Sequence, residues 1–320
     1  IDIESENKSC KVFSKTFILA CGALENARIL LINAEKNKIF HNNNTGRYFM
    51  DHPRQTLGFL KLKENVKINS LYGIKKINKS FRRSLQLSSN FKKENKLLNS
   101  YCFLEPKFSQ DELYLFDEII NDIKKVLKFS GFPKINLNKI NINKIFQLFY
   151  FLLPSQVSNS IFNSLIYNYL NLIKPNLIFK ELNLEYQSEQ SPNFESRVYL
   201  GKDFDMYKQK KLVVDWKLNS LDHKTTDYFL NSFKNKFLSS VYFSFVENQN
   251  KEISDASHHS GTTRISNDRE DGVIDLNNKF HDIENLYISG SSTFRISGSS
   301  NPGLTNMAMS LRLGDHINNL

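Results

Sequence analysis

The residues best suited to chemistry gather near the C-terminus, in a run with two histidines. The run reads His258-His259-Ser260-Gly261-Thr262-Thr263-Arg264. A neutral imidazole, with an unperturbed pKa of about 6.5, is suited to take a proton from a substrate hydroxyl. Neighbouring histidines can also bind a metal, but Ser260, Thr262 and Thr263 are poor ligands, so we expect no metal. The run therefore indicates a general base, and a polar loop without chemistry is the alternative.

A second polar group, Asn301, stands directly before Pro302 and Gly303. We expect a helix over residues 302–317, because Asn is typical of the cap and Pro of the first helical position. The Asn301 amide could then serve only the helix N–H groups. A Pro-Gly start after a Gly/Ser-rich loop, however, leaves the positive end of the helix open to an anionic ligand. We therefore expect Asn301 to contact substrate, and the backbone of Pro302, Gly303 and Leu304 to face a cofactor.

Two strand–turn–helix units would position these groups. One covers residues 11–33 and the other residues 285–317, and each has a short apolar strand followed by a glycine turn. Backbone N–H groups at such strand ends can bind a ligand. The candidate ligand-binding positions in the two turns are Gly22, Ala23, Gly290 and Ser291. A tight turn without a ligand is the alternative for each.

Four stretches of the tail follow one another in a characteristic order. They are His258-His259-Ser260-Gly261-Thr262, Gly272-Val273-Ile274-Asp275, Asn285 to Ser292, and Asn301-Pro302-Gly303-Leu304-Thr305. This order closely resembles the C-terminal signature of the glucose-methanol-choline (GMC) oxidoreductases. Further stretches resemble the same family in the expected order: Ile18 to Leu31, Gly46 to Pro53, Glu189 to Asn193, Ser196 to Val198, and Val214 to Trp216.

The resemblance implies FAD as cofactor, hydride transfer to the flavin N5 atom, and an alcohol or sugar-like CH–OH donor. It favours His258 over His259 as the base, because its offset from Gly261 matches the catalytic histidine of the family. Asn301 would position the substrate oxygen, and His52 is expected to be a structural junction residue. A flavin-containing lyase of the same family and an inactive fragment or binding module are the alternatives, and the electron acceptor stays open.

The resemblance also implies a fold class, α/β locally and α+β overall. We expect an FAD-binding Rossmann-like domain split along the chain, with an inserted substrate domain built on a mainly antiparallel sheet with helices. The predicted boundaries are residues 1–45, 46–254 and 255–320, the middle segment being the substrate domain. No Gly-x-Gly-x-x-Gly turn is present, so we expect the N-terminal part of the FAD site to lie upstream of Ile1.

The middle of the chain carries weaker signals. Strands are expected at residues 182–186, 197–200 and 212–216, with Trp216 in a core and residues 189–216 in a sheet behind the active site. An amphipathic helix is expected at residues 113–127, and residues 161–173 also have a helical pattern. The stretch from 55 to 185 shows no family motif.

Composition excludes several classes of protein. The net charge is +10, but Lys and Arg are interleaved with Asn, Ile and Leu, which indicates a solvated basic surface and no nucleic-acid partner. The three cysteines, Cys10, Cys21 and Cys102, form neither a CxxC motif nor an even-numbered framework, which favours a reducing, cytoplasmic compartment. No apolar run reaches the roughly 18 residues of a membrane span.

Overall fold

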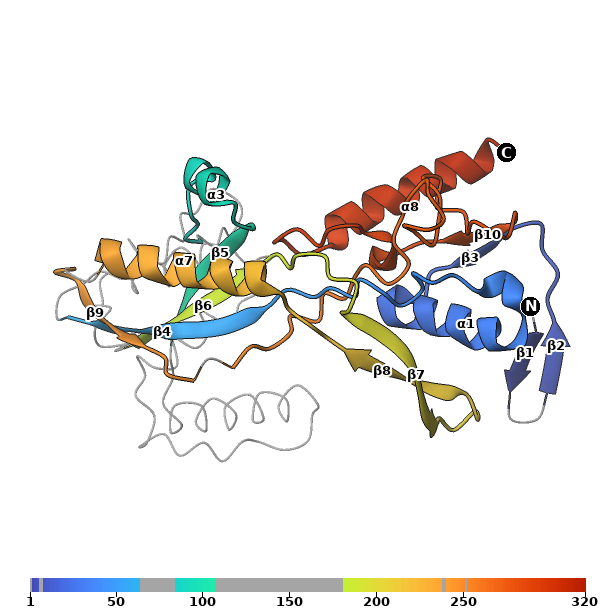
Figure 1. Ribbon diagram of the computed structural model, residues 1–320, viewed down its shortest axis with the longest axis horizontal. Helices are drawn as coiled ribbons and strands as arrows, with labels where there is room; N and C mark the ends of the chain where they lie inside the picture. The colour runs from blue at the N-terminus through green and yellow to red at the C-terminus, as the bar shows by residue number, and fades with distance from the viewer. Residues whose placement is uncertain (1, 6–7, 64–83, 107–180, 238–239, 251) are drawn as a thin grey trace, which may run out of the picture.

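A computed structural model describes residues 2–5, 8–63, 84–106, 181–237, 240–250 and 252–320. Its elements form two lobes along the long axis of the molecule (Figure 1). One lobe holds a four-stranded sheet from the middle of the chain, and the other holds elements from both ends. The segments that connect the two lobes carry the polar residues of the candidate site.

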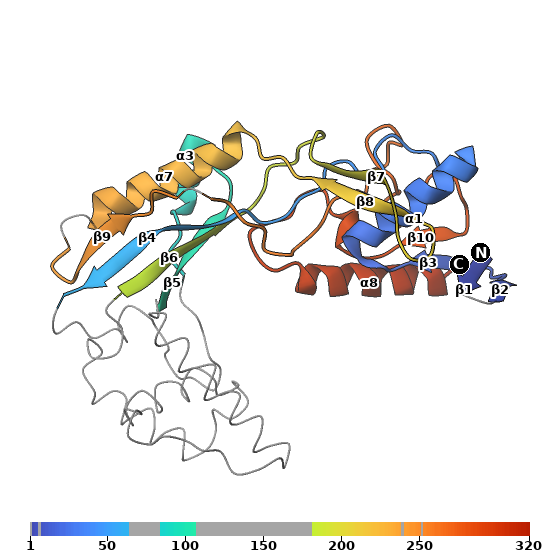
Figure 2. The same cartoon turned by 90° about the horizontal axis from the view of Figure 1, so that it is seen from below.

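The first lobe is an antiparallel sheet covered on one face by a helix (Figure 2). Its strands are, in spatial order, β5 (Ser100–Pro106), β6 (Glu181–Ser188), β4 (Arg54–Leu62) and β9 (Phe243–Glu247). Every neighbouring pair in this sheet is antiparallel. The covering helix is α7 (Ser220–Phe237), and the short helix α3 (Ser89–Asn95) follows its cap Ser88.

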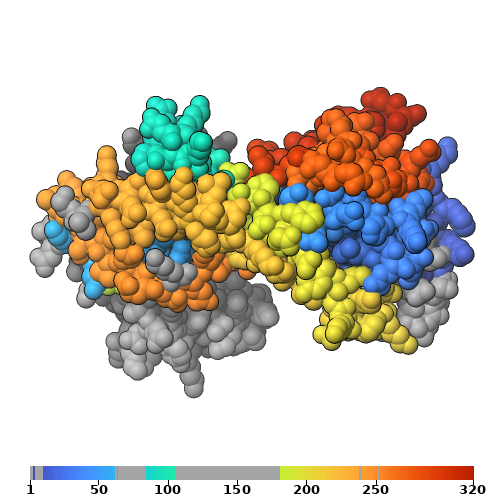
Figure 3. Space-filling model, in the orientation of Figure 1, coloured from blue at the N-terminus to red at the C-terminus, as the bar shows by residue number. Residues whose placement is uncertain are grey.

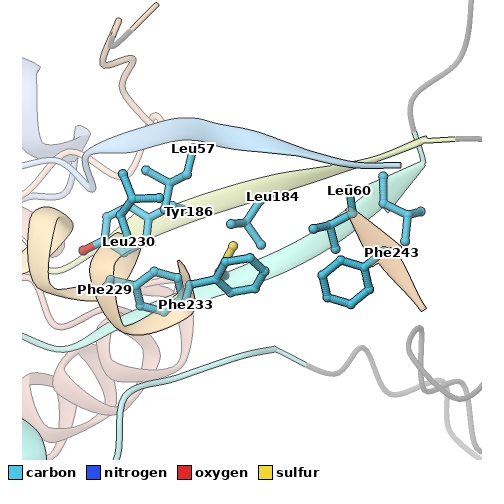
Figure 4. Packing of buried hydrophobic residues seen from close by; sticks show 10 residues of the cluster. Leu57, Leu60, Leu184, Tyr186, Phe229, Leu230, Phe233 and Phe243 are labelled. Carbon is cyan, nitrogen blue, oxygen red and sulfur yellow. The ribbon is translucent and has the colours of Figure 1, made fainter. Parts of the chain in front are cut away.

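Alternation along β6 explains how this lobe buries its core. Leu182, Leu184 and Tyr186 occupy every second position of the strand and are buried on the face toward α7. Phe229 and Phe233, four residues apart on α7, lie on one side of the helix and meet them (Figure 4). The burial of these apolar side chains is the main stabilising contribution to this lobe.

The second lobe joins the two ends of the chain. Strands β3 (Phe17–Leu19) and β10 (Leu286–Ile288) pair in parallel, and α1 (Gly22–Lys36) and α8 (Gly303–Asn318) follow the respective strands and their loops. The core beneath them contains Leu30, Ile274, Phe280 and Ile288. The shorter elements are β1 (Asp2–Ser5) and β2 (Lys8–Lys11), which pair antiparallel, η1 (Lys38–Phe40) and η5 (Ser291–Thr293).

An antiparallel hairpin of β7 (Arg197–Phe204) and β8 (Lys210–Asp215) packs on α1. Figure 3 shows α1, in blue, between this hairpin, in yellow, and the C-terminal segment, in orange and red. Val198 and Ala27 are buried at the contact, and Trp216 packs against it while half-buried. The hairpin therefore attaches the middle of the chain to the second lobe.

The expected strands and the two strand–turn–helix units are confirmed, with two corrections. Helix α8 begins at Gly303 with Pro302 as its cap, one residue later than predicted. Residues 189–196 connect strands and belong to none. The expected helices at 113–127 and 161–173 lie outside the described residues. None of the described helices is long and apolar enough to cross a membrane.

Candidate active site

His258 lies on the loop between β9 and β10 and is half-buried. Its Nδ1 atom is 3.0 Å from Nδ1 of His52, and the two rings meet edge to face with centroids 5.0 Å apart. His52 belongs to the Asp51-His52-Pro53 segment, just before β4. The predicted base thus has an imidazole partner that lies 206 positions earlier in the sequence.

Asp51 holds the histidine loop in place. Its side chain is fully buried, and its Oδ1 accepts hydrogen bonds from the backbone N–H groups of His52 (2.6 Å), Ala256 (3.1 Å) and His258 (3.1 Å). Hydrogen bonds to an ionised carboxylate are roughly twice as strong as those between neutral groups. The backbone at both histidines is therefore fixed by one carboxylate.

The neighbouring His259 points elsewhere. Its Nε2 atom faces Oδ2 of Asp51 at 3.4 Å, and its ring lies near Phe49 with centroids 5.6 Å apart. Asp51, Asp255 and His259 place one ligand atom each within 4.8 Å of one another. The absence of a metal at these residues stays a prediction. The two histidines thus diverge, and only His258 contacts His52.

His52 is buried at the junction, and burial is the main cause that lowers its pKa. The charge of His258 lowers this pKa further, while backbone hydrogen bonds to Ser297 and Gly298 partly oppose the shift. Nε2 of Gln187, on β6, lies 3.0 Å from Nδ1 of His52 and donates to the carbonyl of Ser299 at 3.2 Å. The sequence suggested only a junction role for His52, and neither its contact with His258 nor Gln187 was predicted.

Asn301 is exposed and lies just before the start of α8. It was expected at the helix cap, but Pro302 occupies that position and no side chain caps the helix. The alternative in which the Asn301 side chain caps the helix is therefore wrong. Gly303 is open, since a Cβ built there meets nothing within 4 Å, and Leu304 is exposed. The convergence of Asn301 with His258 stays a prediction.

The two glycine turns lie side by side because β3 and β10 are paired. Gly22 has φ +86° and Gly290 has φ +118°, values that residues with a Cβ rarely adopt. A Cβ added at Gly22 would meet nothing within 4 Å, and one at Gly290 would meet only Asn26 Nδ2 at 3.7 Å. The predicted positions therefore form two adjacent turns with open space beside the backbone.

Ser291 and Ala23 connect these turns to the histidine loop. The Ser291 hydroxyl donates to the carbonyl of His259 at 2.6 Å, and the Ser291 carbonyl accepts from the N–H of Gly261 at 3.2 Å. Thr262 donates its hydroxyl proton to the carbonyl of buried Ala23. The histidine loop is thus hydrogen-bonded to both strand-end turns.

Several solved structures share this fold. A pyridoxine 4-oxidase from Mesorbium loti matches with a TM-score of 0.54 at 11% identity, covering 100% of this chain and 54% of the oxidase. An FAD-dependent oxidoreductase from Chaetomium thermophilum matches with a TM-score of 0.53 at 12% identity, covering 98% of this chain and 57% of that protein. A formate oxidase from Aspergillus oryzae gives 0.50 at 14% identity, with coverages of 95% and 54%.

The chain therefore has a mixed α/β fold that oxidoreductases also adopt, and it spans about half the length of these proteins. Residues 192–310 match the family model described as GMC oxidoreductase. The family predicted from the motifs is confirmed over residues 192–310, which match the GMC oxidoreductase model. No curated protein matches the chain.

Proposed function

We propose that this chain forms part of an FAD-dependent oxidoreductase that acts on the CH–OH group of an alcohol or sugar-like substrate. His258 takes the hydroxyl proton, and Asn301 donates a hydrogen bond to the same oxygen. Bound FAD would supply the hydride acceptor, its N5 atom. The observation that carries the proposal is the pair of hydrogen bonds from the histidine loop to Ser291, which attach the base to the turn after β10.

The residues present fit such a cofactor. The backbone is open at Gly22 and Gly290, so a ligand can approach both strand ends closely. The start of α8 is open at Gly303, and a helix N-terminus stabilises the negative charge that a reduced flavin carries. We infer that Gly22, Ala23, Gly290 and Ser291 lie along the cofactor, with the backbone of residues 301–304 beside its ring.

We further infer the domain organisation. Residues 1–45 and 255–320 would be two parts of one Rossmann-like domain, and residues 46–254 the substrate domain between them. The parallel pairing of β3 with β10 supports the first part of this inference, and the antiparallel sheet of β4, β5, β6 and β9 supports the second. The β7–β8 hairpin, although in the middle segment, packs on α1 and would lie at the domain boundary.

Rapid mixing of the FAD-loaded full-length enzyme with alcohols and sugars, without oxygen, tests the function. We expect a substrate to bleach the flavin absorbance, and His258→Ala to slow this step by about 10²–10⁴-fold with the flavin still bound. His259→Ala is the matched comparison and should have a smaller effect. An unchanged rate in His258→Ala would refute the assigned base, while turnover without bleaching would indicate the lyase alternative.

A further inference from the structure

The amide of Gln187 determines which ring nitrogen of His52 carries a proton. Its side chain is more than nine-tenths buried, and its Nε2 contacts both the Ser299 carbonyl and Nδ1 of His52. A carbonyl oxygen only accepts hydrogen bonds, so the amide nitrogen must be the atom on this side. An amide nitrogen only donates, and Nδ1 of His52 is therefore an acceptor.

His52 is then the tautomer with its proton on Nε2. Burial lowers its pKa and favours the neutral ring, which carries one proton only. The tautomer of a histidine is set by the hydrogen bonds of its two nitrogens, and here Gln187 supplies the deciding one.

The same reasoning extends to His258. Its Nδ1 lies 3.0 Å from Nδ1 of His52, a hydrogen-bond distance. Two lone pairs facing each other at this distance repel, so the contact is attractive only if Nδ1 of His258 carries a proton and donates it. The lone pair of His52 is then shared by two donors, the amide of Gln187 and the imidazole of His258.

We propose that Gln187 and His52 are positioning residues that hold His258 in its Nδ1–H tautomer, so that the free lone pair of Nε2 is the proton acceptor. The chemical part of this proposal rests on the proposed function. In that reaction the substrate O–H bond breaks and an N–H bond forms at Nε2 of His258, while bound FAD would supply the acceptor for the hydride from the substrate carbon. The imidazolium keeps its Nδ1–H bond to neutral His52, which stabilises the added charge.

Asp51 makes this arrangement rigid. One carboxylate oxygen of Asp51 accepts from the backbone N–H of both His52 and His258, so the backbone atoms of the two residues are held close together. The contact between the two Nδ1 atoms involves groups of this chain alone, so one tautomer of His258 is favoured without contact to substrate. The tautomer is therefore a property of the chain itself and can be measured whether or not the protein is an enzyme.

Nitrogen-15 NMR of the histidine rings, recorded at about pH 8, measures the tautomer directly. We expect His258 to show a protonated Nδ1 and an unprotonated Nε2, its signals being assigned by their loss in His258→Ala. A protonated Nε2 on His258 in the unaltered chain overturns the proposal. This measurement needs neither flavin nor substrate.

Two variants of equal shape separate hydrogen bonding from packing. His52→Asn can present an amide oxygen near the former Nδ1 position, whereas His52→Leu has the same shape and no acceptor. We expect His258 to keep its tautomer in His52→Asn and to shift toward Nε2–H in His52→Leu. Flavin reduction should be slowed at least about tenfold more in the Leu variant, within the 10²–10⁴-fold contributed by the base. Equal spectra and rates for the two variants refute the proposal.

A third variant covers the case in which a position 52 variant fails to fold. Gln187→Glu has the same size but replaces the amide donor with a carboxylate acceptor, so His52 should take its proton on Nδ1 and donate it. His258 would then accept through Nδ1 and carry its proton on Nε2. An unchanged His258 tautomer in Gln187→Glu counts against the proposal. If the NMR results hold but His258→Ala reduces flavin normally, the proposed function fails and the tautomer assignment stands.

Discussion

The side chain of Asn26 bridges two strand ends that come from opposite ends of the chain. Its Oδ1 accepts from the N–H of Cys21 at 2.9 Å, and its Nδ2 donates to the Ser289 carbonyl at 3.0 Å and to the Ser292 hydroxyl at 2.9 Å. Asn26 is fully buried, and Ser289 lies 263 positions further along the sequence. One amide therefore holds the two glycine turns in register.

Asn26→Ala should destabilise the lobe formed by the chain ends. It removes three hydrogen bonds and leaves buried partners unsatisfied, so we expect a loss of about 2–4 kcal/mol in the free energy of unfolding. Trp216 is the only tryptophan and packs against the contact of α1 with β7, so its fluorescence during urea unfolding reports on this lobe. The matched control is Asn33→Ala, whose amide bonds only a carbonyl of its own helix. Equal losses in both variants would contradict the bridging role.

Asn301→Ala should separate chemistry from stability. The Asn301 side chain does not cap α8, so we expect the melting temperature to stay unchanged. If its amide holds the substrate oxygen, the variant loses one hydrogen bond to a reacting group. The rate of flavin reduction should then fall by about 10–100-fold. Stopped-flow absorbance and thermal unfolding measure the two effects. A lower melting temperature with an unchanged rate would show that Asn301 is structural.

Stability should decrease as the pH falls below the ordinary pKa of histidine. The pKa of His52 is lowered in the folded protein, mainly by burial, so the unfolded chain binds this proton first. The contribution of neutral His52 is complete above about pH 6.5 and is lost toward the lower folded pKa, by at most about 1.4 kcal/mol per pH unit.

Urea unfolding at pH 7.5 and pH 5.5 measures this dependence. His52→Asn removes the titrating group and should lose less stability between the two values than the unaltered chain. His41→Asn alters an exposed histidine and serves as the control, with a pH dependence like that of the unaltered chain. If His52→Asn and His41→Asn behave alike, burial of His52 does not govern the pH dependence.

Gly303→Ala should raise the stability of the protein but weaken cofactor binding. A Cβ at this position meets nothing within 4 Å, and Ala restricts the unfolded chain, so the free energy of unfolding should rise by about 0.4–1 kcal/mol. If the start of α8 faces the flavin, the added methyl group weakens FAD binding at least about tenfold, the effect of a 1–3 kcal/mol steric clash. Gly314→Ala, in the same helix and equally open, should stabilise without this loss. Fluorescence titration of the full-length protein with FAD compares the two, and equal affinities would exclude Gly303 from the site.

Local patterns predicted most of the elements correctly. The strand and helix at residues 17–36 follow from a short apolar run, a glycine and a helical spacing of apolar residues, all of which act over a few residues. Strand β6 follows in the same way from its apolar residues at alternating positions, which are the ones buried in the structure. The start of α8 was predicted one residue too early, with Asn301 as the cap in place of Pro302. The first residue of a helix depends on backbone dihedral angles, which residue types alone do not fix.

The sequence alone indicated the family resemblance, the pair His258 and Asn301 as candidates, and the glycine turns, because each depends on residue types at short spacings. Only the tertiary structure decided that His52, Gln187 and the Ser299 carbonyl meet beside His258. These groups come from loops and a strand separated by more than 100 positions, and no periodic pattern encodes a contact between them. Burial at the junction of the two lobes brings them together, since the buried polar groups there must find hydrogen-bond partners in one another.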